Sequence, residues 1–128
     1  KIVKKKQSDA EYLTKHLSNL KGLILPKVSK KMTHAYYMYA IRLNKKIIKI
    51  SKKRIFELLI KNGLPVAYKY ENLSKLPIFR KKNVTFKNIE DMNLYEYIGI
   101  KMWAYDFKKE DLKFIVSKFK KIWKKLKL

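Results

Sequence analysis

Residues 34–80 constrain the fold of this chain more than any other stretch. Residues 35–43 are rich in Tyr and Ile and are bounded by polar residues, which is typical of a central β-strand. Ser51 then precedes an amphipathic run, and Gly63 provides the left-handed residue that often ends a helix. Residues 65–70 follow as a short extended piece. This order predicts a strand, a capped helix and a further strand in one fold that mixes α and β structure.

The segments on either side predict three more helices and two more strands. Toward the N-terminus, a helix is predicted to stop at Gly22, and residues 23–25 before Pro26 are interpreted as an edge strand. The apolar residues of that helix recur at helical spacing: Ala10, Leu13, Leu17 and Leu20. Toward the C-terminus, Asn88 is the expected cap of a helix of about two turns, and residues 99–105 are expected to form the last strand.

The last helix has the longest amphipathic pattern. Asp106 is its expected N-cap. Its apolar side chains form one stripe: Leu112, Ile115, Val116, Phe119, Ile122, Trp123 and Leu126. The lysine-rich residues 118–127 are also typical of helices that lie on a membrane surface or bind calmodulin. Because their apolar positions continue the stripe, we expect the stripe to be buried and the lysines to face solvent.

Helices and strands alternate, but several connections between strands are too short for a helical crossover. We therefore predict an α+β fold, with a small, mostly antiparallel sheet and helices packed on one face. Residues 1–128 are expected to form a single domain. The absence of cysteine excludes disulfides and thiolate metal sites. No apolar run approaches the ~20 residues of a membrane helix, so no membrane association is expected.

A formal net charge of +23 raises the alternative of a small basic module that binds nucleic acid. Only Arg42, Arg54 and Arg80 are arginines among the 33 basic residues, although the arginine fork is the preferred contact to bases and phosphates. Residues with AT-rich codons are abundant, which favours lysine simply as the default surface residue. Such a charge still predicts non-specific binding of polyanions at low salt.

Several polar and aromatic residues have both a structural and a functional interpretation. Tyr36, Tyr37 and Tyr39 would alternate between the faces of a strand, so at least one is expected in the core, whereas the others are able to stack on a nucleobase. His34 is expected to be a hydrogen-bonded structural residue, because His16 is the only other histidine and a metal site has no support.

Arg42 ends the predicted central strand among lysines, so its planar fork is expected to have a specific partner. The partner is either Glu57 or Asp106 within the domain, or a group outside it. We favour an ion pair within the domain, worth about 0–1 kcal/mol if exposed.

The motifs follow one another in a distinctive order: an edge strand with Leu25-Pro26, a strand over residues 34–42, a helix over residues 52–64, a loop over residues 68–79, and a late strand and helix over residues 99–128. This order resembles the C-terminal small domain of the DegT–StrS family of sugar-nucleotide aminotransferases, which use pyridoxal phosphate. The resemblance covers essentially the whole chain.

The resemblance implies an enzyme part that is inactive alone. The family's cofactor lysine, its aspartate and its phosphate-binding groups belong to a large domain, and nothing here matches them, so no catalytic or cofactor-binding residue is assigned to this chain. The implied partners are the large domain of the same polypeptide, a second copy in a homodimer, and a sugar nucleotide. The implied role is cytoplasmic, in the synthesis of surface polysaccharide such as lipopolysaccharide. The start at Lys1, without methionine or signal segment, favours a trimmed or partial polypeptide.

By the same resemblance, residues 68–76 would face the sugar nucleotide. Tyr68, Tyr70, Glu71 and Asn72 are the implied substrate-binding residues, although Asn72 stands where the family commonly has proline. The alternative is a surface turn that packs on the sheet through its leucine side chains.

Overall fold

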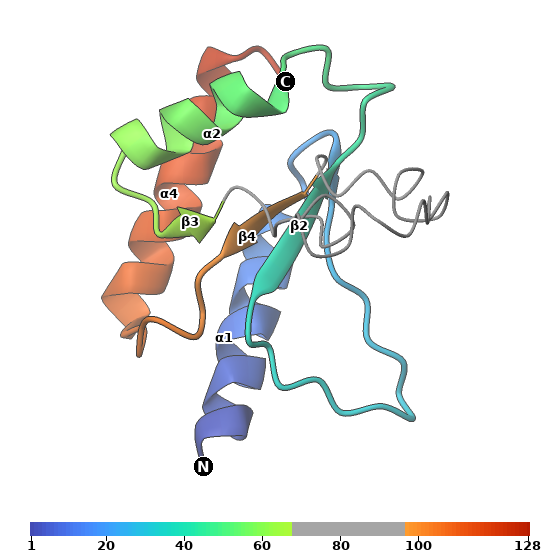
Figure 1. Ribbon diagram of the computed structural model, residues 1–128, viewed down its shortest axis with the longest axis vertical. Coiled ribbons are helices and arrows are strands. Elements are labelled where there is room, and N and C mark those ends of the chain that lie inside the picture. Colours follow the sequence, from blue (N-terminus) through green and yellow to red (C-terminus); the bar gives the residue numbers. More distant parts are fainter. Residues whose placement is uncertain (68–96) are drawn as a thin grey trace, which may run out of the picture.

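The computed structural model describes residues 1–67 and 97–128, which form helices packed against a four-stranded sheet (Figure 1). The elements in chain order are α1 (Ile2–Leu17), β1 (Leu23–Ile24), β2 (Tyr39–Leu43), α2 (Lys52–Lys61), β3 (Val66–Ala67), β4 (Tyr97–Ile100) and α4 (Lys109–Lys125). The helix expected after Asn88 lies outside the described residues. In the two described ranges, no helix is long and apolar enough to cross a membrane.

The sheet is antiparallel, with β2 and β4 in the middle. Its strand order is β1-β2-β4-β3. Tyr39 at the start of β2 lies opposite Ile100 at the end of β4, and Val66 of β3 lies opposite Ile100 on the other side. The ends of the sheet therefore bring together the loop before β2, the turn before β3 and the loop after β4. The predicted α+β fold is confirmed.

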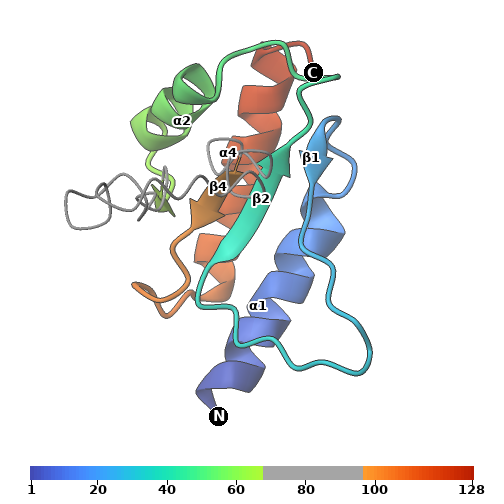
Figure 2. The same ribbon diagram turned by 45° about the vertical axis from the view of Figure 1, so that its right-hand side comes forward.

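Helices α1 and α4 lie side by side behind β2 and β4 in both views (Figures 1 and 2). Helix α2 contacts α4 and β3. Alternate residues of the strands point into the space between sheet and helices, as the pleat requires. The core there includes Leu13 and Leu17 of α1, Tyr39 and Ile41 of β2, Ile98 and Ile100 of β4, and Phe119 and Trp123 of α4.

Three strands are shorter than predicted, and β1 differs least, because it ends at Ile24 rather than at residue 25. β2 begins at Tyr39 rather than at residue 35, because Tyr36 has a φ of +47°, a left-handed conformation that a strand does not contain. β4 ends at Ile100 rather than at Tyr105, because the amide of Met102 donates a hydrogen bond to the carbonyl of Ile100 (2.9 Å) and turns the chain.

Glycine ends α2 but not α1. α1 ends at Leu17, earlier than predicted, and Gly22 (φ +81°) belongs instead to the turn that leads into β1. α2 begins as predicted, with the Ser51 hydroxyl accepting a hydrogen bond from the amide of Arg54 (3.3 Å). Gly63, at φ +78°, closes it as predicted.

Asp106 does not cap α4, which corrects the prediction. The helix begins at Lys109, and the carboxylate of Asp111 accepts a hydrogen bond from the amide of Lys108 (2.7 Å). Asp106 instead lies 3.4 Å from the Nζ of Lys5 on α1. Asp106 therefore forms an ion pair with a residue of α1 instead of a hydrogen bond at the start of α4.

The apolar stripe of α4 is buried, as predicted. The buried residues are Leu112, Ile115, Val116, Phe119, Ile122 and Trp123, and Leu126 is partly buried. The indole N–H of Trp123 donates a hydrogen bond to the carbonyl of Lys21 (2.9 Å), which ties α4 to the turn before β1. The lysines of this helix therefore lie over a core stripe rather than beside a free apolar face.

Candidate functional site

The described residues include the strand that precedes the predicted substrate loop, but not the residues of the loop. Tyr68, Tyr70, Glu71 and Asn72 lie outside the described residues, and the description ends at Ala67. Their proposed contacts with substrate therefore stay a prediction.

β3 holds the start of that loop at the edge of the sheet. Gly63 turns the chain out of α2, and the carbonyl of Pro65 then accepts a hydrogen bond from the amide of Lys101 (2.8 Å). Ala67 consequently lies opposite Gly99 in the antiparallel ladder with β4. The loop leaves from a position anchored to a central strand.

The face of the sheet that points away from the helices, here called the outer face, is nearly flat beside Ala67. The residues on this face are Ile24, Ala40, Arg42, Ala67, Tyr97 and Gly99, of which Gly99 has no side chain. Ala40, Gly99 and Ala67 lie in one row across three strands. A Cβ on Gly99 would meet the sulfur of Met38, so the methionine side chain covers the middle of this row. The outer face is therefore low and apolar at its centre.

Arg42 stands exposed on the outer face, directly opposite Tyr97. The predicted ion pair is not formed among the described residues, since Asp106 pairs with a lysine of α1 and no ion pair joins Arg42 to Glu57. The Nζ of Lys52 lies 5.9 Å from the centre of the Tyr97 ring.

Aromatic side chains gather where β2 begins and β4 ends. This cluster, called the aromatic end, consists of Tyr36, Tyr37, Trp103, Tyr105 and Phe107. The rings of Tyr37 and Trp103 stack 4.7 Å apart with their planes 9° from parallel, yet these side chains are 58% and 41% exposed. The rings of Tyr105 and Phe107 stack 5.6 Å apart. An exposed, ordered pair of this kind is able to hold a flat or apolar surface.

A cavity of about 480 Å³ opens beside the aromatic end. Ile2, Trp103, Ala104 and Tyr105 contribute apolar surface to its lining, and Lys1, Lys5, Lys6 and Asp106 contribute charged groups. Lys5 and Asp106 form an ion pair with each other, so the cavity carries both signs of charge.

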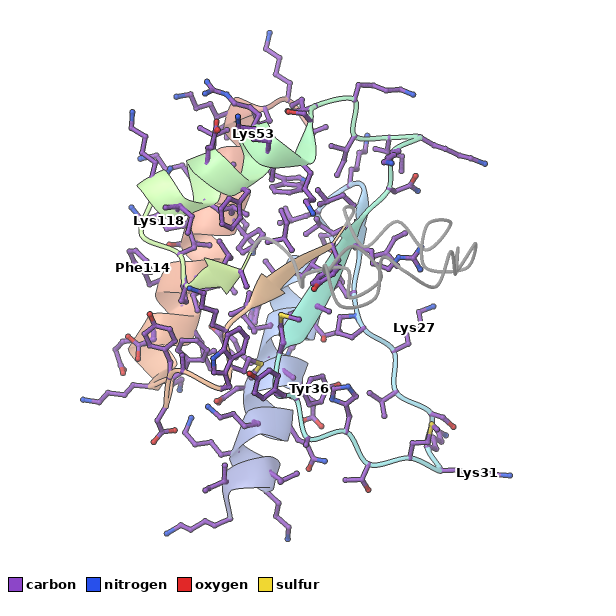
Figure 3. All side chains as sticks on the ribbon, viewed as in Figure 1. Lys27, Lys31, Tyr36, Lys53, Phe114 and Lys118 are labelled. Carbon is purple, nitrogen blue, oxygen red and sulfur yellow. The ribbon has the colours of Figure 1, made fainter. Side chains whose placement is uncertain are left out.

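The three tyrosines do not share one strand. Tyr39 alone belongs to β2 and is buried, which confirms its expected place in the core. Burial raises the pKa of Tyr39 to about 12, although a hydrogen bond with the Thr14 hydroxyl (2.8 Å) acts in the opposite direction. Tyr36 is half-buried, and burial raises its pKa as well (Figure 3). Tyr37 is exposed.

His34 has the structural role that the sequence predicts. Its Nδ1 accepts a hydrogen bond from the amide of Tyr36 (2.9 Å), and the two rings lie 4.3 Å apart. His16 packs 4.3 Å from the ring of Tyr12. Across the described part of the chain, no group of three His, Cys, Asp or Glu residues is placed to hold a metal ion.

Comparison with known proteins assigns this arrangement to a family. A model of the DegT/DnrJ/EryC1/StrS aminotransferase family matches residues 1–120. The chain belongs to this aminotransferase family.

Solved structures of aminotransferases share the fold of the chain at low identity. The aminotransferase TlmJ from Streptoalloteichus hindustanus has a TM-score of 0.79 and 17% identity over 98% of this chain, which covers 33% of TlmJ. PseC of Helicobacter pylori, an aminotransferase involved in the biosynthesis of pseudoaminic acid, has a TM-score of 0.77 and 17% identity over 96% of this chain and 33% of its own.

A curated relative is similar over a shorter stretch. The uncharacterized protein MJ1066 of Methanocaldococcus jannaschii is 29% identical over 91 residues, which is 68% of this chain and 24% of the relative. The chain thus spans about a quarter of this relative and a third of the two solved structures.

Aminotransferases of this family use pyridoxal phosphate, and the described residues do not fit a covalent site for it. Every lysine in residues 1–67 and 97–128 is exposed or half-buried. The hydrogen bond from Lys5 to Asp9 (2.9 Å) raises the pKa of Lys5, whereas a lysine that bonds the cofactor must lose its proton readily.

The sequence interpretation of residues 99–105 as one strand misses the aromatic end. In a strand that continued to residue 105, Trp103 and Tyr105 would share one face of the sheet. Ala104 and Asp106 are poor strand formers, and they are the signal that favours a loop here. The stacking of Tyr37 on Trp103 has no local signal, because it depends on how two distant loops meet.

Proposed function

We propose that this chain is the C-terminal small domain of a pyridoxal-phosphate-dependent aminotransferase that acts on a keto-sugar nucleotide. The amino donor is glutamate, and the product serves the cytoplasmic stage of surface polysaccharide synthesis, such as that of lipopolysaccharide. One observation carries the proposal. The chain aligns over 98% of its length with only 33% of an aminotransferase, so its fold corresponds to one part of such an enzyme.

We assign the cofactor site and the scaffold for the substrate loop to two different parts of one polypeptide. A large domain, in an enzyme that is a homodimer, supplies the cofactor site, and this chain does not transaminate alone. Pyridoxal phosphate supplies the electron sink that amino transfer requires. This chain supplies a scaffold, in which β3 ends at Ala67, directly before residues 68–76 in the sequence. Tyr68, Tyr70, Glu71 and Asn72 are proposed to hold the sugar nucleotide.

The decisive experiment compares this chain with the complete polypeptide. The reading frame upstream of Lys1 should encode a domain of about 240–260 residues, the size of one α/β domain. The complete polypeptide should transfer the amino group of glutamate to a keto-sugar nucleotide, and this chain alone should show no transfer. Transfer by the isolated chain, or none by the complete polypeptide with any keto-sugar nucleotide of a broad panel, contradicts the proposal.

The cofactor has its own test on the isolated chain. After incubation with pyridoxal phosphate and reduction with borohydride, we expect weak labelling spread over many surface lysines. Complete labelling of one lysine, mapped by peptide mass spectrometry, would show a cofactor site within this chain.

The proposed loop is tested in the complete enzyme. Tyr70→Phe and Asn72→Ala should impair the use of the sugar nucleotide and leave cofactor binding intact. If both variants keep normal kinetics for the sugar nucleotide, residues 68–76 form a surface turn rather than a substrate contact.

The net charge of +23 supports one alternative, a nucleic-acid-binding module. Both functions predict salt-sensitive binding of polyanions. Only the alternative predicts a sequence- or structure-selective complex that survives physiological salt.

A further inference from the structure

A groove between α2 and α4 has basic residues on both of its walls. Its volume is about 390 Å³. Arg54 and Lys61 of α2 form one wall, and Lys121 and Lys125 of α4 form the other. Leu58 and Ile122 lie between them as an apolar floor, and Asn62 completes the lining. The spacing of 54, 58, 61 and 62 places these residues on one face of α2.

No carboxylate lines this groove. Glu57, the acidic residue of α2, is not part of the lining, and the ion pairs found among the described residues join Lys5 to Asp9 and to Asp106. The cavity at the aromatic end, in contrast, includes Asp106 in its lining. The four cations of the α2–α4 groove therefore face one another without an acidic partner in the described part of the chain.

Four like charges around one small volume repel each other, and the repulsion is relieved by a counter-charge placed between them. All four side chains are exposed, so they are able to turn toward a ligand without uncovering the core. The guanidinium of Arg54 presents a planar fork that matches phosphate oxygens, and the three lysines act as point charges. The side-chain amide of Asn62 is held by a hydrogen bond to the carbonyl of Leu58 (2.8 Å).

We propose that the α2–α4 groove binds a small anion that carries several phosphate groups. Facing walls and a confined volume suit a compact ligand with three or four negative charges better than an extended strand, which would need cations in a line along the surface. The apolar floor has room for an uncharged part of the same ligand. This inference does not rest on the proposed aminotransferase function.

Inorganic tripolyphosphate is the probe, and calorimetry with the full chain at physiological salt is the measurement. We expect one saturable site per chain. Arg54→Gln together with Lys121→Gln removes one cation from each wall, and each loss should weaken binding by about tenfold, the scale of one charge-assisted hydrogen bond.

Lys27→Gln together with Lys31→Gln is the matched control. These lysines project from the loop before β2, on the opposite side of the molecule from Lys53 of α2 and Lys118 of α4 (Figure 3). The control lowers the net charge by the same amount as the groove variant, but away from the groove. General charge attraction acts through the summed field of the protein and would weaken both variants alike. If the groove is the binding site, the affinity of the control should stay within about twofold of that of the parent chain. Circular dichroism checks that both variants keep their helices, and Lys61→Gln with Lys125→Gln repeats the test if the first pair unfolds the chain.

Three results would overturn the proposal. An equal loss of affinity in the control pair means that tripolyphosphate responds only to net charge. Absence of a saturable site means that the groove is a solvated basic surface. A single-stranded oligonucleotide that binds this groove while tripolyphosphate does not makes it a nucleic-acid contact.

Discussion

Trp123 joins two parts of the chain, α4 and the turn before β1, through a single side chain. It is 2% exposed, its ring lies 5.9 Å from that of Phe119, and its N–H bonds the carbonyl of Lys21. The other tryptophan, Trp103, is 41% exposed and rests on Tyr37. The two residues offer a direct comparison between a core and a surface aromatic.

Trp123→Ala should lower the free energy of unfolding by about 3–5 kcal/mol, because it removes a large buried ring and leaves a cavity. Trp103→Ala should lower it by at most about 1 kcal/mol, as is usual for an exposed side chain. Urea denaturation followed by circular dichroism measures both. Similar losses in the two variants would contradict the assignment of Trp123 to the core.

Tyr39 should make stability depend on pH in the alkaline range. Its pKa is about 12 in the folded chain, against about 10 for an unfolded tyrosine. A raised pKa means that the stabilising contribution is fully present below pH ~10 and is lost as the pH rises through 12. Tyr39→Phe cannot ionise, so its stability should fall less than that of the parent chain over this interval.

Lysines also lose their protons in this range, but they do so in both proteins and cancel in the comparison. Unfolding free energies measured at several pH values between 9 and 12 provide the test. A constant difference between the parent chain and Tyr39→Phe would show that the ionisation of Tyr39 is not linked to folding.

At the scale of elements, α4 depends on a cap supplied from within its own first turn. Asp111 accepts the hydrogen bond from the amide of Lys108, whereas Asp106 is 84% exposed and contacts Lys5. Asp111→Ala should therefore lower the free energy of unfolding by about 1 kcal/mol, the usual contribution of a cap.

Asp106→Ala is the control and should change stability by no more than about 0.5 kcal/mol, as an exposed ion pair does. Thermal and urea denaturation distinguish the two variants. A larger loss for Asp106→Ala would restore Asp106 as the residue that starts the helix.

Elements with local signals were predictable from the sequence, and those set by distant contacts were not. The hydroxyl of Ser51, the conformation of Gly63 and the stripe of α4 all act within a few residues, and the structure contains each of them. The beginning of β2 was not predictable, because it depends on the left-handed backbone of Tyr36. The predicted cap of α4, Asp106, was wrong, because Lys5 of another helix attracts Asp106 and Asp111 accepts the hydrogen bond at the start of the helix.

The candidate site likewise has one feature that local sequence signals predict and others that depend on contacts between distant residues. The position from which the predicted substrate loop starts follows from Gly63 and Pro65, which are visible in the sequence. The exposed stack of Tyr37 on Trp103 forms between two loops that are distant in the sequence and lie close together only in the folded chain. Neither hydrophobic periodicity nor a sequence motif predicts this contact. The groove between α2 and α4 likewise depends on how two helices pack.

At the scale of the whole molecule, repulsion among basic residues is the dominant electrostatic effect. The net charge is +23, and both ion pairs in the described part of the chain belong to Lys5. Salt screens the repulsion between exposed charges. The melting temperature should therefore rise as sodium chloride is increased from low to physiological concentration.

A variant with Lys27, Lys31 and Lys53 changed to Glu should show a smaller rise, because less repulsion remains to be screened. Each of these lysines is exposed, so the substitutions should leave the core intact. Calorimetric melting at several salt concentrations measures the slope. A melting temperature that does not change with salt in the parent chain would contradict this account.

The packing of α1 against α4 also determines when the domain is able to fold. The hydrogen bonds from Lys5 to the carbonyl of Phe107 and from Trp123 to the carbonyl of Lys21 each join residues 102 positions apart. Contacts of such long range require the closure of a large loop and slow the folding of a chain. During translation the apolar face of α1 lacks its contacts with α4 until α4 has left the ribosome. We therefore expect this domain to complete its core only after synthesis of its last helix, with chaperones protecting α1 in the interval.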